Sequence, residues 1–245
     1  MVNSSVKKPA RLRLKTWIKP VTVVLWLIVA VFFLQHFLVA VMVLLRDLGF
    51  VIADTTASRV SLDTAYRVLL IAMVIAVPWL TIKHRTSLRE LGLQRSLSWT
   101  DISVSILAFM AYFILSAVVL YLAVTLISSF DINQTQELGV RSSLYGVELI
   151  MAFMLFAVVA PISEEIIMRG WLFGKLKRYH VPFWINALIG SLLFAVAHGQ
   201  WNVGVDVFVL SMVLSFIREK TGSIWAGVLV HMIKNIIAFY LVFVR

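Results

Sequence analysis

The chain contains no cysteine and few charged residues. Of its 245 residues, only 14% are Asp, Glu, Lys or Arg, whereas 61% are hydrophobic. The absence of cysteine excludes disulfide bonds, thiolate nucleophiles and cysteine-ligated metals. A soluble domain has roughly a quarter of its residues charged. The scarcity of charge, with a mean hydropathy of +0.96, therefore predicts a polytopic membrane protein.

Several features of secreted or multidomain proteins are also lacking. The apolar run Val21–Leu45 is too long for the core of a signal peptide, and no small-residue cleavage site follows it. We find no internal repeat, low-complexity linker or soluble domain. The first helix is therefore expected to stay as an anchor, and the chain to form one all-α membrane bundle.

The apolar runs predict about seven transmembrane helices. The second and sixth runs are short, so six or eight spans also fit. Trp171–His180, basic and aromatic, is expected to form an interfacial elbow after the fourth span. The expected spans are Val21–Leu45, Val68–Ile82, Ile102–Phe130, a fourth from about Leu144 through the Glu164–Glu165 pair, Pro182–His198, Val203–Ile217 and Ser223–Val244.

The net charge of +10 is better explained by membrane topology than by nucleic-acid binding. With the N-terminus in the cytoplasm, the cytoplasmic segments would hold 16 of the 22 Lys and Arg residues. This bias is typical of the positive-inside rule. One of these cytoplasmic segments is a basic tail over residues 1–20, which we expect to contact anionic lipid head groups.

The stretch Pro161–Gly170 carries two adjacent carboxylates after a long apolar run. Glu165 and Arg169 are four residues apart, so they share a helix face and can form an ion pair. Glu164 then has no local partner. A charge at membrane depth costs on the order of 3 kcal/mol. Glu164 is therefore either solvated at a helix end or functional.

Two further spans carry polar groups. His198 ends the fifth span, four residues after Phe194, and His231 and Asn235 share one face of the seventh. If these helices pack side by side, two His, an Asn and a carboxylate converge within the bilayer. A carboxylate beside a His can activate water, while an amide or second His stabilises an oxyanion. Alternatively, two His and a Glu can hold zinc with an open position for water.

The motifs Glu-Glu-x-x-x-Arg, Phe-x-x-x-His and His-x-x-x-Asn, on separate helices in this order, resemble those of the CPBP family. This family, also called Abi, comprises CAAX proteases and bacteriocin-processing intramembrane endopeptidases. The stretch Leu88–Leu93 resembles the "ELGL" segment that precedes its core. The resemblance divides the chain into residues 1–84, a basic tail with two helices, and a protease core over residues 85–245.

The resemblance implies roles for the site residues. Glu164 would be the general base and His198 would polarise the water. His231 and Asn235 would stabilise the oxyanion. Supporting roles fall to Glu165, held by Arg169, and to Phe194, which shapes the pocket. The family implies either no metal or a divalent metal such as zinc, for which the ligands would be His198, His231 and Glu164.

The expected function is thus that of a multi-pass membrane endopeptidase. Its partners would be membrane lipid and a peptide or prenylated protein substrate, with no nucleic acid. Two alternatives remain: a non-catalytic or immunity-type scaffold of the same fold, and a small transporter or proton relay. Paired discontinuous repeats would favour a transporter, and we find none in the sequence.

Several residues do not fit this scheme readily. The expected span edges place His198 towards the far side of the membrane from Glu164. For the two to meet, either the fourth span must continue towards Lys175 or the fifth span must begin deeper or tilt strongly. Lys234 is unusual at mid-membrane, and it either pairs with a carboxylate or lines the cavity. Asp206 and Glu148 lie near expected span ends and are interpreted as solvated or capping groups.

Overall fold

The computed structural model describes residues 10–50, 53–82, 85–131 and 144–245. Residues 132–143 of the predicted loop and residues 1–9 of the basic tail, with Lys7 and Lys8, lie outside the described residues, as do Lys83 and Arg141. Within the described part the fold is entirely helical, which confirms the predicted class. The expected tail is shorter than predicted, because helix begins at Ala10.

Six of the described helical segments are long and apolar enough to span a membrane, and α8 is a shorter apolar helix. The expected number of about seven is thus met only if α8 is included. The elements are α1 (Ala10–Asp47), α2 (Thr56–Ile82), α3 (Leu88–Leu91), α4 (Trp99–Leu126), α5 (Gly146–Phe153), η1 (Met154–Val159), α6 (Ala160–Glu165), η2 (Ile166–Leu172), α7 (Phe173–Arg178), α8 (Phe183–Ala197), α9 (Trp201–Thr221) and α10 (Trp225–Phe243).

Two predicted boundaries are wrong in ways that affect the site. Helix α2 begins at Thr56 rather than Val68, so Arg67 lies within a helix instead of a loop. The expected elbow does not form, because α5 to α7 make one continuous segment, Gly146–Arg178. Two aromatic residues at the start of this stretch are buried in the bundle: Trp171 and Phe173 are 2% and 3% exposed.

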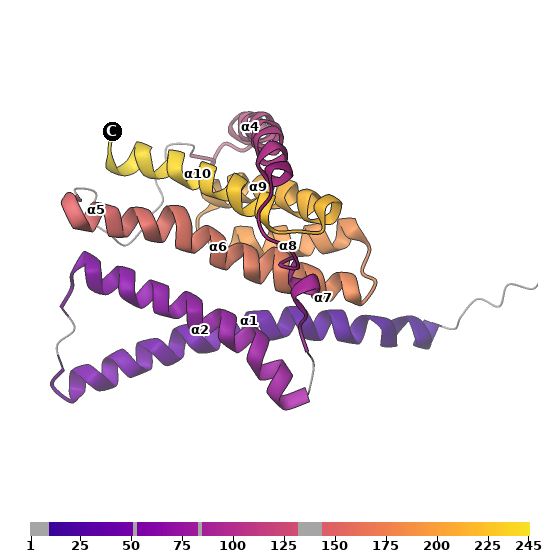
Figure 1. Ribbon diagram of the computed structural model, residues 1–245, viewed down its shortest axis with the longest axis horizontal. Coiled ribbons are helices and arrows are strands. Elements are labelled where there is room, and N and C mark those ends of the chain that lie inside the picture. The colour runs from indigo at the N-terminus through magenta and orange to yellow at the C-terminus, as the bar shows by residue number, and fades with distance from the viewer. Residues whose placement is uncertain (1–9, 51–52, 83–84, 132–143) are drawn as a thin grey trace, which may run out of the picture.

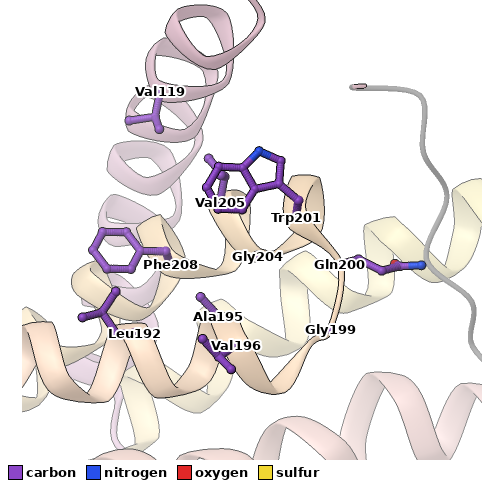
Figure 2. A pocket seen from close by; sticks show the side chains of 10 residues that line it. All are labelled: Val119, Leu192, Ala195, Val196, Gly199, Gln200, Trp201, Gly204, Val205 and Phe208. Carbon is purple, nitrogen blue, oxygen red and sulfur yellow. The ribbon is translucent and has the colours of Figure 1, made fainter. Parts of the chain in front are cut away.

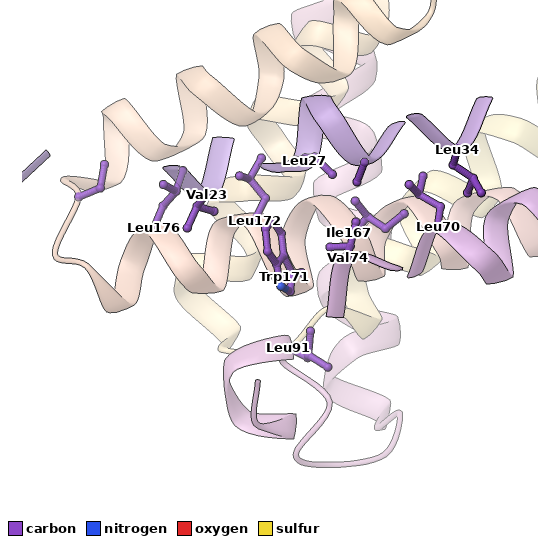
Figure 3. Packing of buried hydrophobic residues seen from close by; sticks show 12 residues of the cluster. Val23, Leu27, Leu34, Leu70, Val74, Leu91, Ile167, Trp171, Leu172 and Leu176 are labelled. Atoms are coloured by element: carbon purple, nitrogen blue, oxygen red, sulfur yellow. The ribbon is translucent and has the colours of Figure 1, made fainter. Parts of the chain in front are cut away.

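The α1–α2 hairpin packs along one side of the α5–α7 helix, and α10, α9 and α8 lie on its other side (Figure 1). The first interface is a cluster of large apolar side chains that includes Leu27, Val74, Trp171 and Leu172 (Figure 3). Lipid is as apolar as these side chains, so helix association in a bilayer depends on close packing and interhelical hydrogen bonds. The helix that carries Glu164 and Glu165 continues beyond Glu165 along this interface.

The Leu88–Leu93 stretch forms α3, a single turn that joins three other elements. Gly92 ends it in the left-handed conformation (φ 73°), which glycine adopts without strain. Arg218 at the end of α9 donates to the carbonyl of Glu90 at 2.8 Å and to that of Arg169 at 3.0 Å. The short helix therefore fixes the depth of the α9–α10 hairpin against the Glu-bearing helix.

Gly174 allows α3 to approach α7 closely, which gives a stability prediction. A Cβ atom there would lie 2.3 Å from the backbone carbonyl oxygen of Glu90. Overpacking of this kind costs about 1–3 kcal/mol. We therefore expect Gly174→Ala to lower the melting temperature in detergent by several degrees. Gly190→Ala is the matched control, because no described atom apart from its chain neighbours and the nearby backbone of its own helix lies within 4 Å of its Cβ position. Equal melting temperatures for the two variants would contradict this role of α3.

Candidate active site

Two π-helical segments flank the turn that carries the carboxylates. The segments η1 and η2 lie directly before and after α6, and π-bulges of this kind are frequent at functional sites. A carbonyl of each accepts a side-chain hydrogen bond from another helix. Asn235 Nδ2 donates to Phe156 O at 2.9 Å, and Arg218 donates to Arg169 O. The bulges thus connect the Glu-bearing helix to α9 and α10.

The continuous α5–α7 helix resolves the expected mismatch in depth. Glu164 lies 14 residues before Arg178, about 21 Å of helix at ~1.5 Å per residue. His198 lies 15 residues after Phe183, about 22 Å along the antiparallel α8. The two groups are therefore at similar heights above the α7–α8 turn. Of the two ways in which the groups could meet, the structure therefore shows the continuation of the fourth span towards Lys175.

Glu165 is fully buried and lies between the side chains of Arg169 and His231. Its Oε1 accepts from Arg169 Nη1 at 2.9 Å and lies 3.2 Å from His231 Nδ1. The predicted Glu165–Arg169 pair therefore forms. A carboxylate on Nδ1 fixes the orientation of an imidazole and leaves Nε2 for other partners. Glu165 thus positions His231.

Glu164 has a partner that the sequence reasoning did not find. Its Oε1 accepts from Arg67 Nη1 at 2.8 Å, and its Oε2 lies 3.7 Å from His231 Nε2. Arg67 is fixed in turn by Asp63, four residues earlier on α2, at 2.6 Å. The Glu164 side chain is 24% exposed. One of its oxygens is thereby anchored, and the other faces the imidazole.

His198 is oriented by its own helix. Its Nδ1 lies 2.8 Å from the carbonyl oxygen of Phe194. A carbonyl can only accept, so Nδ1 carries the hydrogen and Nε2 of the neutral ring is a free acceptor. The Phe194 ring lies edge-on to both imidazoles, with centroid distances of 4.8 Å to His198 and 5.7 Å to His231. The guanidinium of Arg169 lies 5.0 Å from the same ring.

The bundle therefore gathers residues from four helices around Glu164. Arg67 and His231 face the two oxygens of Glu164, and His198 lies against the same Phe194 ring as His231. Asn235 is on the same face of α10 as His231, but one of its N–H groups is bound to Phe156 O. Its amide has two N–H groups, so one remains for another acceptor.

The proposed metal ligands do not form a recognisable metal site. In the part of the chain that the structure describes, no group of three or more His, Asp or Glu side chains is placed to hold a metal ion. Glu164 and His231 are instead engaged with Arg67 and Glu165. These residues do not fit a divalent metal in this arrangement, and the metal-dependent alternative stays a prediction.

Lys234 and Asp206 form a second charged pair within the bundle. The ammonium of Lys234 lies 3.8 Å from Asp206 Oδ2. The other oxygen of Asp206 accepts from Tyr112 and Ser116 of α4. The interpretation of Asp206 as a solvated or capping group is thus wrong, because a charge within an apolar bundle requires partners. The sequence alone does not reveal that Tyr112 and Ser116, which lie on another helix, donate to Asp206.

An apolar cavity of about 610 Å³ lies between the end of α8, the helix that leads to His198, and the start of α9. Leu192, Val196, Trp201 and Phe208 line it (Figure 2). Its wall also includes Gly199, the residue after His198. Val196 and Trp201 are largely exposed, so the cavity faces the lipid side of the bundle.

Comparison with known proteins supports the resemblance drawn from the motifs. Residues 146–237 match the family model described as "Type II CAAX prenyl endopeptidase Rce1-like". The matched range includes all seven residues for which the motifs predicted a role. The Rce1-like resemblance is thus confirmed over this part of the chain, whereas Arg67 lies outside it.

Curated relatives are similar over shorter stretches. An "Uncharacterized 24.3 kDa protein" of Escherichia coli is 32% identical over 35% of this chain and 41% of its own length. The "UPF0177 protein YxdF" of Lactococcus lactis is 27% identical over 48% of this chain and 63% of its own. The "Putative membrane peptidase YdiL" of Bacillus subtilis is 29% identical over 32% of each chain. The chain therefore covers less than two thirds of each of these relatives, and no solved structure matches it.

Proposed function

We propose that this protein is an integral-membrane endopeptidase in which Glu164 activates the water that attacks a peptide bond. The observation that supports this most is the arrangement of the Glu164 carboxylate. Arg67 anchors one oxygen, and the other faces His231 within a helix bundle. A general base must be ionised, positioned and close to the reacting water. The Rce1-like match over residues 146–237 favours peptide hydrolysis over proton transport.

We assign the steps to the chain's own residues. Water, held by a hydrogen bond to His198 Nε2, loses a proton to Glu164 as its oxygen attacks the carbonyl carbon. The Nε2–H group of His231 and the second N–H of Asn235 donate to the oxyanion that forms. The C–N bond then breaks, and Glu164 returns the proton to the leaving amine. Glu165 and Arg169 act as positioning residues through His231.

We infer that the apolar cavity near His198 accepts a lipid-like group on the substrate. Its residues are apolar, it opens towards lipid, and its volume of about 610 Å³ is sufficient for a long hydrocarbon group. This favours a prenylated or otherwise membrane-held peptide over a soluble one.

On this proposal α2 belongs to the site through Arg67, although it precedes the protease core of residues 85–245. The charge bias further favours a cytoplasmic N-terminus.

Cleavage of a matched peptide pair tests this function. The purified protein in detergent is incubated with a fluorogenic peptide that ends in a prenylated CAAX sequence and with its unprenylated twin, each with and without EDTA. We expect hydrolysis in the presence of EDTA, with kcat/KM at least about tenfold higher for the prenylated peptide, equivalent to ~1.4 kcal/mol. Ala195→Leu, which fills the cavity, should reduce this preference.

The outcomes separate the alternatives. Cleavage abolished by EDTA and restored by zinc would contradict the metal-independent steps assigned above. Equal cleavage of both peptides would contradict the lipid-like substrate but support the peptidase. Cleavage of neither peptide would favour the non-catalytic or immunity-type scaffold.

A further inference from the structure

A second cavity lies at the end of the bundle where α1 enters the apolar span and α7 ends. It has a volume of about 630 Å³ and lies between α1, α2 and α7. Arg178, which lines this cavity, lies 14 residues after Glu164 on the continuous α5–α7 helix, so the cavity is distant from the candidate active site. Its walls combine cationic and aromatic side chains with apolar ones: Lys19, Lys175, Arg178, Trp26, Trp171 and Tyr179 are among them.

The cations of this cavity outnumber the carboxylates that face them. Buried Lys175 pairs with Glu90 at 3.0 Å, and the exposed Arg178 lies 3.4 Å from the same carboxylate. The ammonium of Lys19 lies 5.8 Å from the ring centre of Tyr179. Among the ion pairs formed by the described residues, none includes Lys19. Two of the three cations thus share one carboxylate and the third is paired with none of the described carboxylates, which leaves a local excess of two positive charges.

The wall also offers hydrogen-bond donors in excess. The indole N–H of Trp171 is buried and has no acceptor among the described residues, although buried donors are nearly always paired. Lys19 and Arg178 add further donors at the exposed rim. Among the described residues, the carboxylate paired with cations of this wall is that of Glu90, and Lys175 and Arg178 already share it. A ligand suited to this wall is therefore an acceptor with negative charge.

We propose that this cavity binds the head group of an anionic phospholipid. Its phosphate would lie between Lys19 and Arg178, and its acyl chains would follow the apolar outer surface of α1, where Val21, Leu25 and Val29 are exposed. Lys19 lies two residues after Trp17, where the apolar span begins, which is the depth of lipid head groups. Basic pockets between transmembrane helices bind anionic head groups. The bound lipid braces α7, the end of the helix that carries Glu164, against α1 and α2.

Native mass spectrometry with a matched pair of double variants tests the proposal. Detergent-solubilised full-length protein is mixed with equal amounts of phosphatidylglycerol and phosphatidylcholine, and the lipid retained is counted. The test variant is Lys19→Gln/Arg178→Gln. The control is Arg46→Gln/Arg59→Gln, which removes the same charge at the opposite end of the α1–α2 hairpin. A melting curve in phosphatidylcholine alone confirms that each variant is folded.

We expect wild type and control to retain one phosphatidylglycerol with at least about tenfold preference over phosphatidylcholine, since each cation contributes measurably to anionic lipid binding. The test variant should lose this preference. Equal retention of both lipids by wild type, or an unchanged preference in the test variant, would overturn the proposal. Displacement of the lipid by soluble glycerol phosphate would show a free-phosphate site instead and would also overturn it. None of these readouts depends on peptidase activity.

Discussion

The Arg67→Met variant is expected to lose about 100-fold in kcat/KM while it remains folded. Arg67 holds Glu164 Oε1 at 2.8 Å, so its removal frees the carboxylate to move and leaves it without its cation. A displacement of about 1 Å at a reacting group costs on the order of 100-fold in rate. Methionine keeps the length of the side chain and is compatible with the apolar bundle. The measurement is kcat/KM for the peptide that the wild type cleaves.

Arg59→Met is the matched control for this variant. Arg59 lies on the same helix and pairs with Asp54, but at an exposed position. Exposed pairs contribute ~0–1 kcal/mol, so we expect activity and melting temperature close to those of wild type. Arg67→Lys keeps the charge without the planar guanidinium, so its kcat/KM should lie between those of Arg67→Met and Arg59→Met. Activity of Arg67→Met within about twofold of wild type would show that Glu164 needs no partner from α2.

Local spacing in the sequence is enough to predict some contacts of the candidate site. Glu165 and Arg169 are four residues apart, and so are His231 and Asn235, because such residues share a helix face wherever the helix lies. The long apolar runs also predicted the all-α membrane fold. These inferences depend only on neighbours along one helix.

Contacts between helices could not be predicted in the same way. Arg67 reaches Glu164 across 97 positions of sequence, and its position at the edge of an apolar run resembled that of a loop charge. Asp206 was misinterpreted for the same reason, because its hydroxyl partners lie on α4. The one available signal was negative: Glu164 and Lys234 each lacked a local partner of opposite charge within an apolar span, which indicates a partner from another helix.

The continuous helix through Trp171 was missed because composition does not distinguish an interfacial segment from a buried one. Aromatic and basic residues are typical of membrane interfaces. Here Trp171 and Leu172 pack against α1 and α2 instead, and Lys175 is paired with Glu90. The burial depends on a hairpin more than 90 positions away in sequence, which no local pattern contains.

Glu164→Gln is expected to have the largest effect of any substitution. Glutamine preserves the size of the side chain and can still accept from Arg67, but it cannot take a proton from water. General-base catalysis contributes typically 10²–10⁴-fold, so we expect kcat to fall by about 1,000-fold or more with little change in melting temperature. Glu148→Gln is the control, because this exposed carboxylate lies on the same continuous helix at α5.

The measurement that tests the central claim most directly is therefore hydrolysis of the prenylated peptide by wild type, Glu164→Gln and Glu148→Gln, purified in parallel and treated with EDTA. Mass spectrometry of the products identifies the bond that is cut. The account predicts the same cut by wild type and Glu148→Gln, and none above background by Glu164→Gln. Cleavage by Glu164→Gln at a rate near that of wild type would contradict the assignment of Glu164 as the base.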